Sequence, residues 1–209
     1  MSRNLKWSLL LVAAAAVTVF VAANSTSDEA ATSDEGPPML VRPDSPLLSE
    51  GPDAVFVEVL DFECEACGAA FPVVEAMREV YGERITFVVR YLPLHTNSEN
   101  AAKAAEAARL QGEFEAMYRR LFETQADWGH QPTSRQDKFF AYASDLGLDM
   151  DRFETDFNDP ETAARIAQSK ADVRAFGALG TPTFFLDGEM LGVDSLDSLM
   201  AAIDTAVNN

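Results

Sequence analysis

The sequence predicts an α/β domain built around a parallel strand–helix–strand unit. Residues 54–62 form a nearly continuous run of β-branched and aromatic residues, typical of a central strand that is buried on both faces. Residues 65–81 carry apolar side chains at helical spacing, and Gly82 then provides a helix stop. Residues 85–92 form a second strand-like run that Pro93 ends. A strand, a helix and a strand in this order indicate a parallel unit.

Capping residues, helical spacing and turn residues predict the remaining elements. The expected helices cover 98–110, 113–126, 134–146, 150–157, 160–176 and 195–206, and the expected strands cover 183–186 and 189–191 around an Asp187-Gly188 turn. Pro72 lies inside the first helix and is expected to kink it. Because strand signals are missing from about residue 97 to 160, this stretch is interpreted as a helical insertion.

The first 23 residues have the pattern of an export segment. Arg3 and Lys6 precede an uncharged apolar run of seventeen residues, 7–23. This run is longer than a usual signal-peptide core and reaches the lower limit for a membrane-spanning helix. Residues 1–23 are therefore expected to be a membrane anchor, or else a signal peptide cleaved after Ala23. In both cases the rest of the chain would lie outside the cytoplasm, on the cell surface or in the periplasm, or be secreted after cleavage.

Residues 24–46 are rich in Ser, Thr, Asp, Glu and Pro, a composition that cannot bury a core. They are expected to form a flexible linker, and the folded domain is expected to cover 47–209. We expect a monomer, since no dimerisation segment is apparent.

The composition excludes several classes of protein. With 47% hydrophobic and 10% aromatic residues, the chain can bury a sizeable core and is neither disordered throughout nor collagen-like. Sixteen Lys and Arg against 34 Asp and Glu give a net charge of −18, which repels phosphate backbones and argues against a nucleic-acid partner. Such acidity indicates a solvated surface, and adaptation to high salt is the alternative.

The two cysteines of the chain, Cys64 and Cys67, form a C-x-x-C pair where the first strand meets the first helix. The free N–H groups and the dipole of a helix start favour a thiolate, so Cys64 is expected to be the acidic, exposed sulfur and Cys67 the shielded one. Such a pair can alternate between dithiol and disulfide through a mixed disulfide with a substrate. In this interpretation Cys64 is the nucleophile and Cys67 resolves the mixed disulfide.

A C-x-x-C pair has two other common roles. A zinc site would need further ligands, and His95 and His130 are not in zinc-finger spacing. A purely structural disulfide would close so small a loop that it would remove little chain entropy. Redox chemistry is therefore favoured, with no metal and no cofactor other than the Cys64–Cys67 disulfide itself.

Two further features fit redox chemistry. Glu58 lies in the middle of the first apolar strand, where a buried acid could shuttle a proton to or from Cys67, although a strand-edge position that reaches water is also open. Thr181-Pro182 directly precedes a strand, and a cis bond there would present backbone to an extended substrate beside the sulfurs. Glu58 is thus a candidate catalytic residue, and Thr181 and Pro182 are candidate substrate-binding residues.

The sequence resembles the DsbA-like thiol-disulfide oxidoreductases of the thioredoxin superfamily, particularly their single-domain bacterial branch. The resemblance covers about residues 40–207. Its motifs are Val57–Cys67 around the cysteines, Arg90–His95, Gln111-Gly112 after the alanine-rich helix, and Gly180–Phe185.

The resemblance implies a thioredoxin fold with an inserted helical subdomain. It also implies that Cys64 is the nucleophile, that Cys67 is its resolving partner, that Pro182 is in cis and that Glu58 is the family's strand acid. Exported proteins are the implied substrates, and a quinone-linked membrane oxidase of the DsbB or VKOR type is the implied redox partner.

The dipeptide between the cysteines, Glu65-Ala66, departs from the proline-containing dipeptides of strongly oxidising members. Glu65, with Glu63 and Asp61, is expected to raise the pKa of Cys64 and so to lower the redox potential of the pair. The favoured function is an extracytoplasmic oxidase that forms disulfides in exported proteins. A reductase or isomerase of the same fold is the first alternative, and a non-enzymatic holdase that binds unfolded chains is the second.

Overall fold

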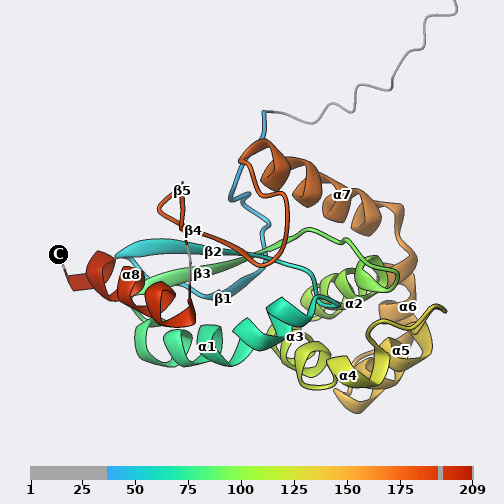
Figure 1. The fold of residues 1–209 in the computed structure, drawn as a ribbon. Helices are drawn as coiled ribbons and strands as arrows, with labels where there is room; N and C mark the ends of the chain where they lie inside the picture. Colours follow the sequence, from blue (N-terminus) through green and yellow to red (C-terminus); the bar gives the residue numbers. More distant parts are fainter. Residues whose placement is uncertain (1–36, 193–194, 209) are drawn as a thin grey trace, which may run out of the picture. The chain divides into compact units, whose positions relative to one another are not determined.

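The strands form one mixed sheet in the order β1-β3-β2-β4-β5 (Figure 1). The structure is a computed structural model that describes residues 37–192 and 195–208. The elements in chain order are β1 (Leu47–Ser49), β2 (Ala54–Leu60), α1 (Glu65–Tyr81), β3 (Ile85–Tyr91), α2 (Ser98–Arg109), α3 (Phe114–Glu123), α4 (Gln125–Trp128), α5 (Gln136–Asp145), α6 (Met150–Asn158), α7 (Pro160–Ala175), β4 (Thr183–Leu186), β5 (Glu189–Met190) and α8 (Leu196–Asn208).

The predicted parallel unit is present at the centre of the sheet. β2 and β3 pair in parallel over their whole length, and α1 connects them. β4 lies antiparallel on the other side of β2, and β5 pairs antiparallel with β4. Because β2 has a neighbour on each side and helices on both faces, nearly all of its residues are buried. The predicted α/β class and thioredoxin fold are therefore confirmed.

β1 is a strand that the sequence analysis did not predict. It has three residues and pairs antiparallel with β3 at the edge of the sheet. Leu47 is exposed and Leu48 is buried, so the segment is too short to show a clear alternation in the sequence.

Two layers of helices enclose the sheet. α1 and α8 lie on one face and α7 on the other (Figure 1). The alternation of side chains along β2 divides the core accordingly, with Phe56 and Leu60 in the larger cluster and Val57 and Val59 in the smaller one. This division places the odd-numbered β2 residues toward α7 and the even-numbered ones, Glu58 among them, toward α1.

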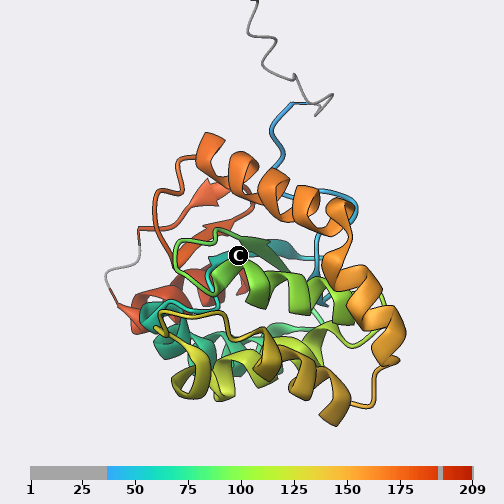
Figure 2. The same ribbon diagram turned by 90° about the vertical axis from the view of Figure 1, so that its right-hand side faces the viewer.

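The predicted helical insertion at about 97–160 is present as α2 to α6. These helices gather at one end of the sheet, as Figure 2 shows. The single helix expected over 113–126 is two, because the chain turns at Thr124 between α3 and α4. α1 continues as one helix through Pro72.

The end of the predicted linker is packed against the domain. Leu40 is buried in the smaller core cluster, and the backbone N–H of Met39 donates to Asp172 on α7. Arg42 forms an ion pair with the same carboxylate. The described part of the 24–46 segment therefore begins the packed domain before Leu47, because it contributes an apolar side chain and a buried charge pair.

The predicted export segment 1–23 lies outside the described residues. Among the helices of residues 37–192 and 195–208, none is both long and apolar enough to span a bilayer.

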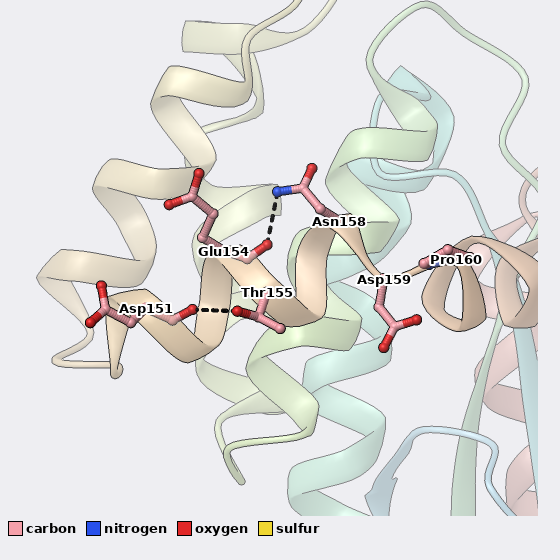
Figure 3. Close-up of a pocket in the computed structure, with 6 residues that line it drawn as sticks. All are labelled: Asp151, Glu154, Thr155, Asn158, Asp159 and Pro160. Carbon is pink, nitrogen blue, oxygen red and sulfur yellow. Dashed lines mark hydrogen bonds between the residues drawn. The ribbon is translucent and has the colours of Figure 1, made fainter.

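The junction of α6 and α7 shows why one helix ends and the next begins (Figure 3). Asn158 Nδ2 donates to the carbonyl oxygen of Glu154 near the end of α6. Asp159 then caps α7 by accepting a hydrogen bond from the N–H of Glu161 at 2.8 Å, and Pro160 occupies the first turn of that helix. The acidic surface pocket at this junction includes neither cysteine.

Candidate active site

Cys64 is the N-cap residue of α1, with an extended backbone conformation. Its carbonyl oxygen accepts a hydrogen bond from the N–H of Gly68 at 3.0 Å, which begins the helix. The side chain of Cys64 is partly exposed, whereas Cys67, one turn further on, is fully buried. Both thiols are free in this structure. The arrangement gives one sulfur that a substrate can reach and one that only its neighbour can reach.

The pKa of Cys64 is lowered to about 5. The hydrogen bond from the Cys67 thiol is the main cause, and it outweighs burial, which raises the pKa. The backbone N–H groups of Cys67 and Ala66 lower it further. The donors at the start of α1 thus hold Cys64 as a thiolate at neutral pH.

The pKa of Cys67 moves in the opposite direction. Its hydrogen bond to Cys64 and its burial both raise it, and the charge that Glu58 carries when it is ionised adds to this effect. Cys67 therefore keeps its proton at neutral pH until a base removes it.

The predicted Thr181-Pro182 cis peptide bond is present. It immediately precedes β4, which lies beside β2 in the sheet. The carbonyl oxygen of Thr181 lies 3.4 Å from the Sγ of Cys64, close enough to accept a hydrogen bond when Cys64 is protonated. Residues more than a hundred positions apart are thereby brought to one place.

Glu58 is 1% exposed and lies in the central strand, so the strand-edge interpretation is wrong. Burial raises its pKa to about 8, although a hydrogen bond from the Tyr118 hydroxyl opposes this shift. The carboxyl group is therefore mostly protonated at neutral pH, but it loses its proton when the pH rises by about one unit.

The acidic residues around the cysteines do not have the predicted effect on Cys64. Asp61 accepts a hydrogen bond from His95, and Glu63 accepts one from the backbone of Asn97. Glu65 is solvated and lies 3.1 Å from the His130 ring. Since each carboxylate has its own partner, the expected rise in the pKa of Cys64 is wrong.

His95 is a further titratable group of this site, and its sequence pattern predicted no role for it there. Burial lowers its pKa, but the hydrogen bond to Asp61 and the attraction of the Cys64 thiolate raise it, with a net increase. The interaction is mutual, so a protonated His95 favours the Cys64 thiolate. The pair Pro93-Leu94 before His95 was the available sequence signal, as part of the Arg90–His95 motif.

The helical insertion fixes the loop that carries Cys64. Gln125, the first residue of α4, donates from Nε2 to the carbonyl oxygens of Phe62 and Cys64 at 2.7 and 2.9 Å. A Cβ at Gly68 would lie 2.4 Å from Gln125 Oε1, so the glycine makes room for this contact. Nothing in the sequence pairs Gln125 with the cysteines, because the contact depends on how α4 packs.

Comparison with known proteins identifies the class. A family model described as thioredoxin matches residues 50–205, which is most of the chain. The chain therefore belongs to the thioredoxin family.

Solved structures show which folds within this family the chain resembles. A thioredoxin-like oxidoreductase from Silicibacter pomeroyi DSS-3 is 30% identical, with a TM-score of 0.68, and the match covers 81% of this chain and 96% of that one. The fold also matches α-DsbA1 from Wolbachia pipientis (TM-score 0.72, 20% identity, 81% and 94% covered) and oxidised BdbD from Bacillus subtilis (TM-score 0.71, 17% identity, 84% and 98% covered). The DsbA-like resemblance is thus confirmed for the fold.

The curated relatives that the chain matches are much longer proteins. The chain is 35% identical over 142 residues to a Na⁺/H⁺ antiporter NhaA of Herminiimonas arsenicoxydans, covering 68% of this chain and 22% of that protein. It is 38% identical over 154 residues to NhaA 3 of Salinispora tropica, covering 72% and 22%. The chain thus spans about a fifth of the length of these relatives.

Proposed function

We propose that this protein is a thiol-disulfide oxidoreductase that acts outside the cytoplasm and forms disulfides in exported proteins. The observation that carries the proposal is the contrast within the cysteine pair, in which a partly exposed thiolate precedes a buried, protonated thiol. A reversible dithiol–disulfide centre requires this contrast, because one sulfur reacts with the substrate and the other stays protonated until it resolves the mixed disulfide.

The oxidising reaction begins with the Cys64–Cys67 disulfide. A client thiolate attacks Cys64 Sγ, the bond between the two sulfurs breaks, and Cys67 leaves with the electron pair and takes a proton. A second client thiolate then attacks the client sulfur of the mixed disulfide and releases Cys64 as a thiolate. The client has lost two electrons and gained a disulfide, and the protein has become a dithiol.

Glu58 supports this cycle as the source and acceptor of the Cys67 proton. It faces the α1 side of the sheet, and its charge acts on the pKa of Cys67. A group with a pKa of about 8 gives up and regains a proton readily near neutral pH. Glu58 would protonate Cys67 as it leaves and deprotonate it when the disulfide is formed again.

The surface beside Cys64 suits an extended, partly apolar client segment. Thr181 and Pro182 bring polypeptide backbone next to the sulfur, and Leu179, just before them, is 84% exposed. Phe176 is also exposed in the same connection between α7 and β4. Backbone groups and apolar side chains recognise unfolded chains without regard to sequence.

The extracytoplasmic location rests on the charged start and apolar run of residues 1–23. Reoxidation then needs an electron acceptor, which a quinone-linked membrane oxidase of the DsbB or VKOR type would supply. The antiporters' ion transport is not carried over, because this chain matches only a fifth of each antiporter.

The redox potential distinguishes an oxidase from a reductase. A Cys64 pKa of about 5 lies between the values of about 7 in thioredoxin and about 3.5 in DsbA. A more stable thiolate makes the disulfide more oxidising, so equilibration with glutathione is expected to give a potential above about −200 mV. A value near about −270 mV would favour the reductase alternative instead.

Trapping tests the chemistry directly. A Cys67→Ala variant of the full chain, expressed in the periplasm of a bacterial host, should accumulate mixed disulfides with exported proteins, identified by mass spectrometry. A Cys64→Ala variant is the matched control and should trap none. If the Cys64→Ala variant still restored disulfide formation in an oxidase-deficient host, the protein would instead be a holdase.

A further inference from the structure

Tyr118 belongs to the helical insertion, yet its hydroxyl reaches the buried acid of the central strand. Its Oη donates to Glu58 Oε2 at 3.1 Å. The Tyr118 side chain is 0% exposed. The other carboxyl oxygen, Glu58 Oε1, has no hydrogen-bond partner among the described residues. A buried carboxyl oxygen without a hydrogen-bond partner costs folding free energy. Its presence here therefore calls for a functional explanation.

Aromatic rings fix the direction of the Tyr118 hydroxyl. Phe62 and Phe122 lie edge-on to it, with ring centroids 6.0 and 5.2 Å away, and Phe71 and Phe114 pack at 5.6 and 6.2 Å. The Tyr118 ring therefore cannot turn away from Glu58 without disturbing the core that joins α1 to α3.

Among the described residues, the other groups around Glu58 are apolar side chains, the Cys67 thiol and a carboxylate. Its neighbours across the sheet are Val89 on β3 and Phe184 on β4. α1 contributes Cys67 and the carboxylate of Glu75, whose charge disfavours ionisation of Glu58.

Glu75 is itself held by two cations, Arg78 on α1 and Arg119 on α3. Tyr118 is therefore the group that supports a negative charge on Glu58 by a hydrogen bond, and burial keeps the Tyr118 pKa well above its usual value, so the donor stays protonated.

We propose that Tyr118 is the positioning residue of the proton shuttle: it holds one oxygen of Glu58 and leaves the other to exchange a proton with Cys67. This proposal rests on the proposed function. When a mixed disulfide at Cys64 closes to the Cys64–Cys67 disulfide, ionised Glu58 takes the Cys67 proton, and the Cys67 thiolate attacks Cys64 Sγ and expels the thiolate that was bound there. In the oxidising direction the same proton returns to Cys67.

The test is the pH dependence of disulfide closure in Tyr118→Phe. The reduced full-length protein is mixed with excess oxidised glutathione, and the closing of the mixed disulfide is followed by acid quench and mass spectrometry. The substitution removes the hydrogen bond to the Glu58 carboxylate, so the midpoint of the pH dependence of closure should rise by about one pH unit. Closure at pH 7 should then be about tenfold slower. The alkylation midpoint of Cys64 should stay the same.

Tyr142→Phe is the matched control, since Tyr142 is a buried tyrosine of the same insertion whose hydroxyl has no partner among the described residues. It should leave the midpoint of closure unchanged. In a Glu58→Gln background, Tyr118→Phe should have no further effect on the pH profile. An equal shift in that background, or no shift in Tyr118→Phe alone, would overturn the proposal.

An infrared titration separates this proposal from the proposed function. The carbonyl band of protonated Glu58, assigned by its loss in Glu58→Gln, should titrate about one pH unit higher in Tyr118→Phe than in the wild type. If the wild-type protein exchanged no disulfides with any thiol, the proposed function would fail, while this titration would still decide whether Tyr118 controls Glu58.

Discussion

At the scale of single residues, the reactivity of Cys64 comes from its hydrogen-bond donors and not from the charge of the residues near it in sequence. Three acidic residues lie within three positions of it, yet its pKa is lowered. The hydrogen bond from the Cys67 thiol lowers the Cys64 pKa most, and the same hydrogen bond raises the pKa of Cys67. The dipeptide between them acts here through the backbone N–H of Ala66.

Replacing Cys67 with alanine should therefore raise the pKa of Cys64. Loss of a hydrogen bond to a charged group is worth about 1.5–3 kcal/mol, or about 1–2 pH units. The pH dependence of iodoacetamide alkylation measures the midpoint, which is expected at about 5 for the wild type. Cys67→Ser retains a donor and should restore much of the shift. Equal midpoints for the wild type and Cys67→Ala would contradict this explanation.

Glu58 should make stability depend on pH. Burial raises its pKa in the folded protein to about 8, whereas in the unfolded chain it is about 4.3. The folded protein thus holds a proton that the unfolded chain has lost, and stability falls as the pH rises from about 4.3 to about 8.

Glu58→Gln should remove this decline, which makes the variant more stable than the wild type at pH 8, by an amount on the order of 3–5 kcal/mol. Urea unfolding at pH 5 and pH 8 measures the difference. Glu99→Gln, at an exposed position on α2, is the control and should follow the wild type. Parallel pH profiles for wild type and Glu58→Gln would show that Glu58 ionises normally.

At the scale of elements, a buried ion-pair network connects the N-terminal segment, β3 and α7. Asp172 on α7 is 1% exposed and accepts hydrogen bonds from Arg42 and Arg90, the latter within β3. Burial alone would raise the Asp172 pKa, but these donors lower it to about 2. α7 leads directly into the connection that carries Thr181 and Pro182, so the network anchors the helix beside the site.

Asp172→Asn should destabilise the protein by about 3–5 kcal/mol, because it removes the carboxylate that pairs with the buried Arg90. Denaturant midpoints at pH 7 measure this loss. The stabilisation by Asp172 should also fade as the pH falls from about 3.9 toward 2, since the folded-state pKa is the lower one. Asp44→Asn is the matched control: its pair with Arg165 is exposed, so its loss should cost less than about 1 kcal/mol.

At the scale of the whole molecule, the cysteine pair links redox state to stability. The thiolate of Cys64 is stabilised only in the folded, reduced protein, because the Cys67 thiol and the backbone N–H groups at the start of α1 donate to it there. A disulfide that is less stable than its dithiol is an oxidising disulfide.

The reduced protein should therefore be more stable than the oxidised one at pH 7, by about 1–2 kcal/mol after solvent screening at the partly exposed sulfur is allowed for. Because the folded-state pKa is depressed, this advantage is complete above about pH 8.5 and is lost as the pH falls through about 5. Urea unfolding of both redox forms at pH 5 and pH 8 measures it. A more stable oxidised form at pH 8 would indicate a reducing protein.

The sequence by itself determined the framework of this protein. Hydrophobic runs of different period located the helical regions and every described strand except β1, because these signals are local. The C-x-x-C pair at a strand–helix junction likewise predicted a partly exposed Cys64 and a shielded Cys67. The tertiary structure alone decided the pKa values of the two thiols. It brought Thr181 and Gln125 to Cys64 and Tyr118 to Glu58 from distant parts of the chain, and it gave the acidic neighbours partners of their own. A pKa depends on every charge and donor within a few ångströms, and only packing determines which groups those are.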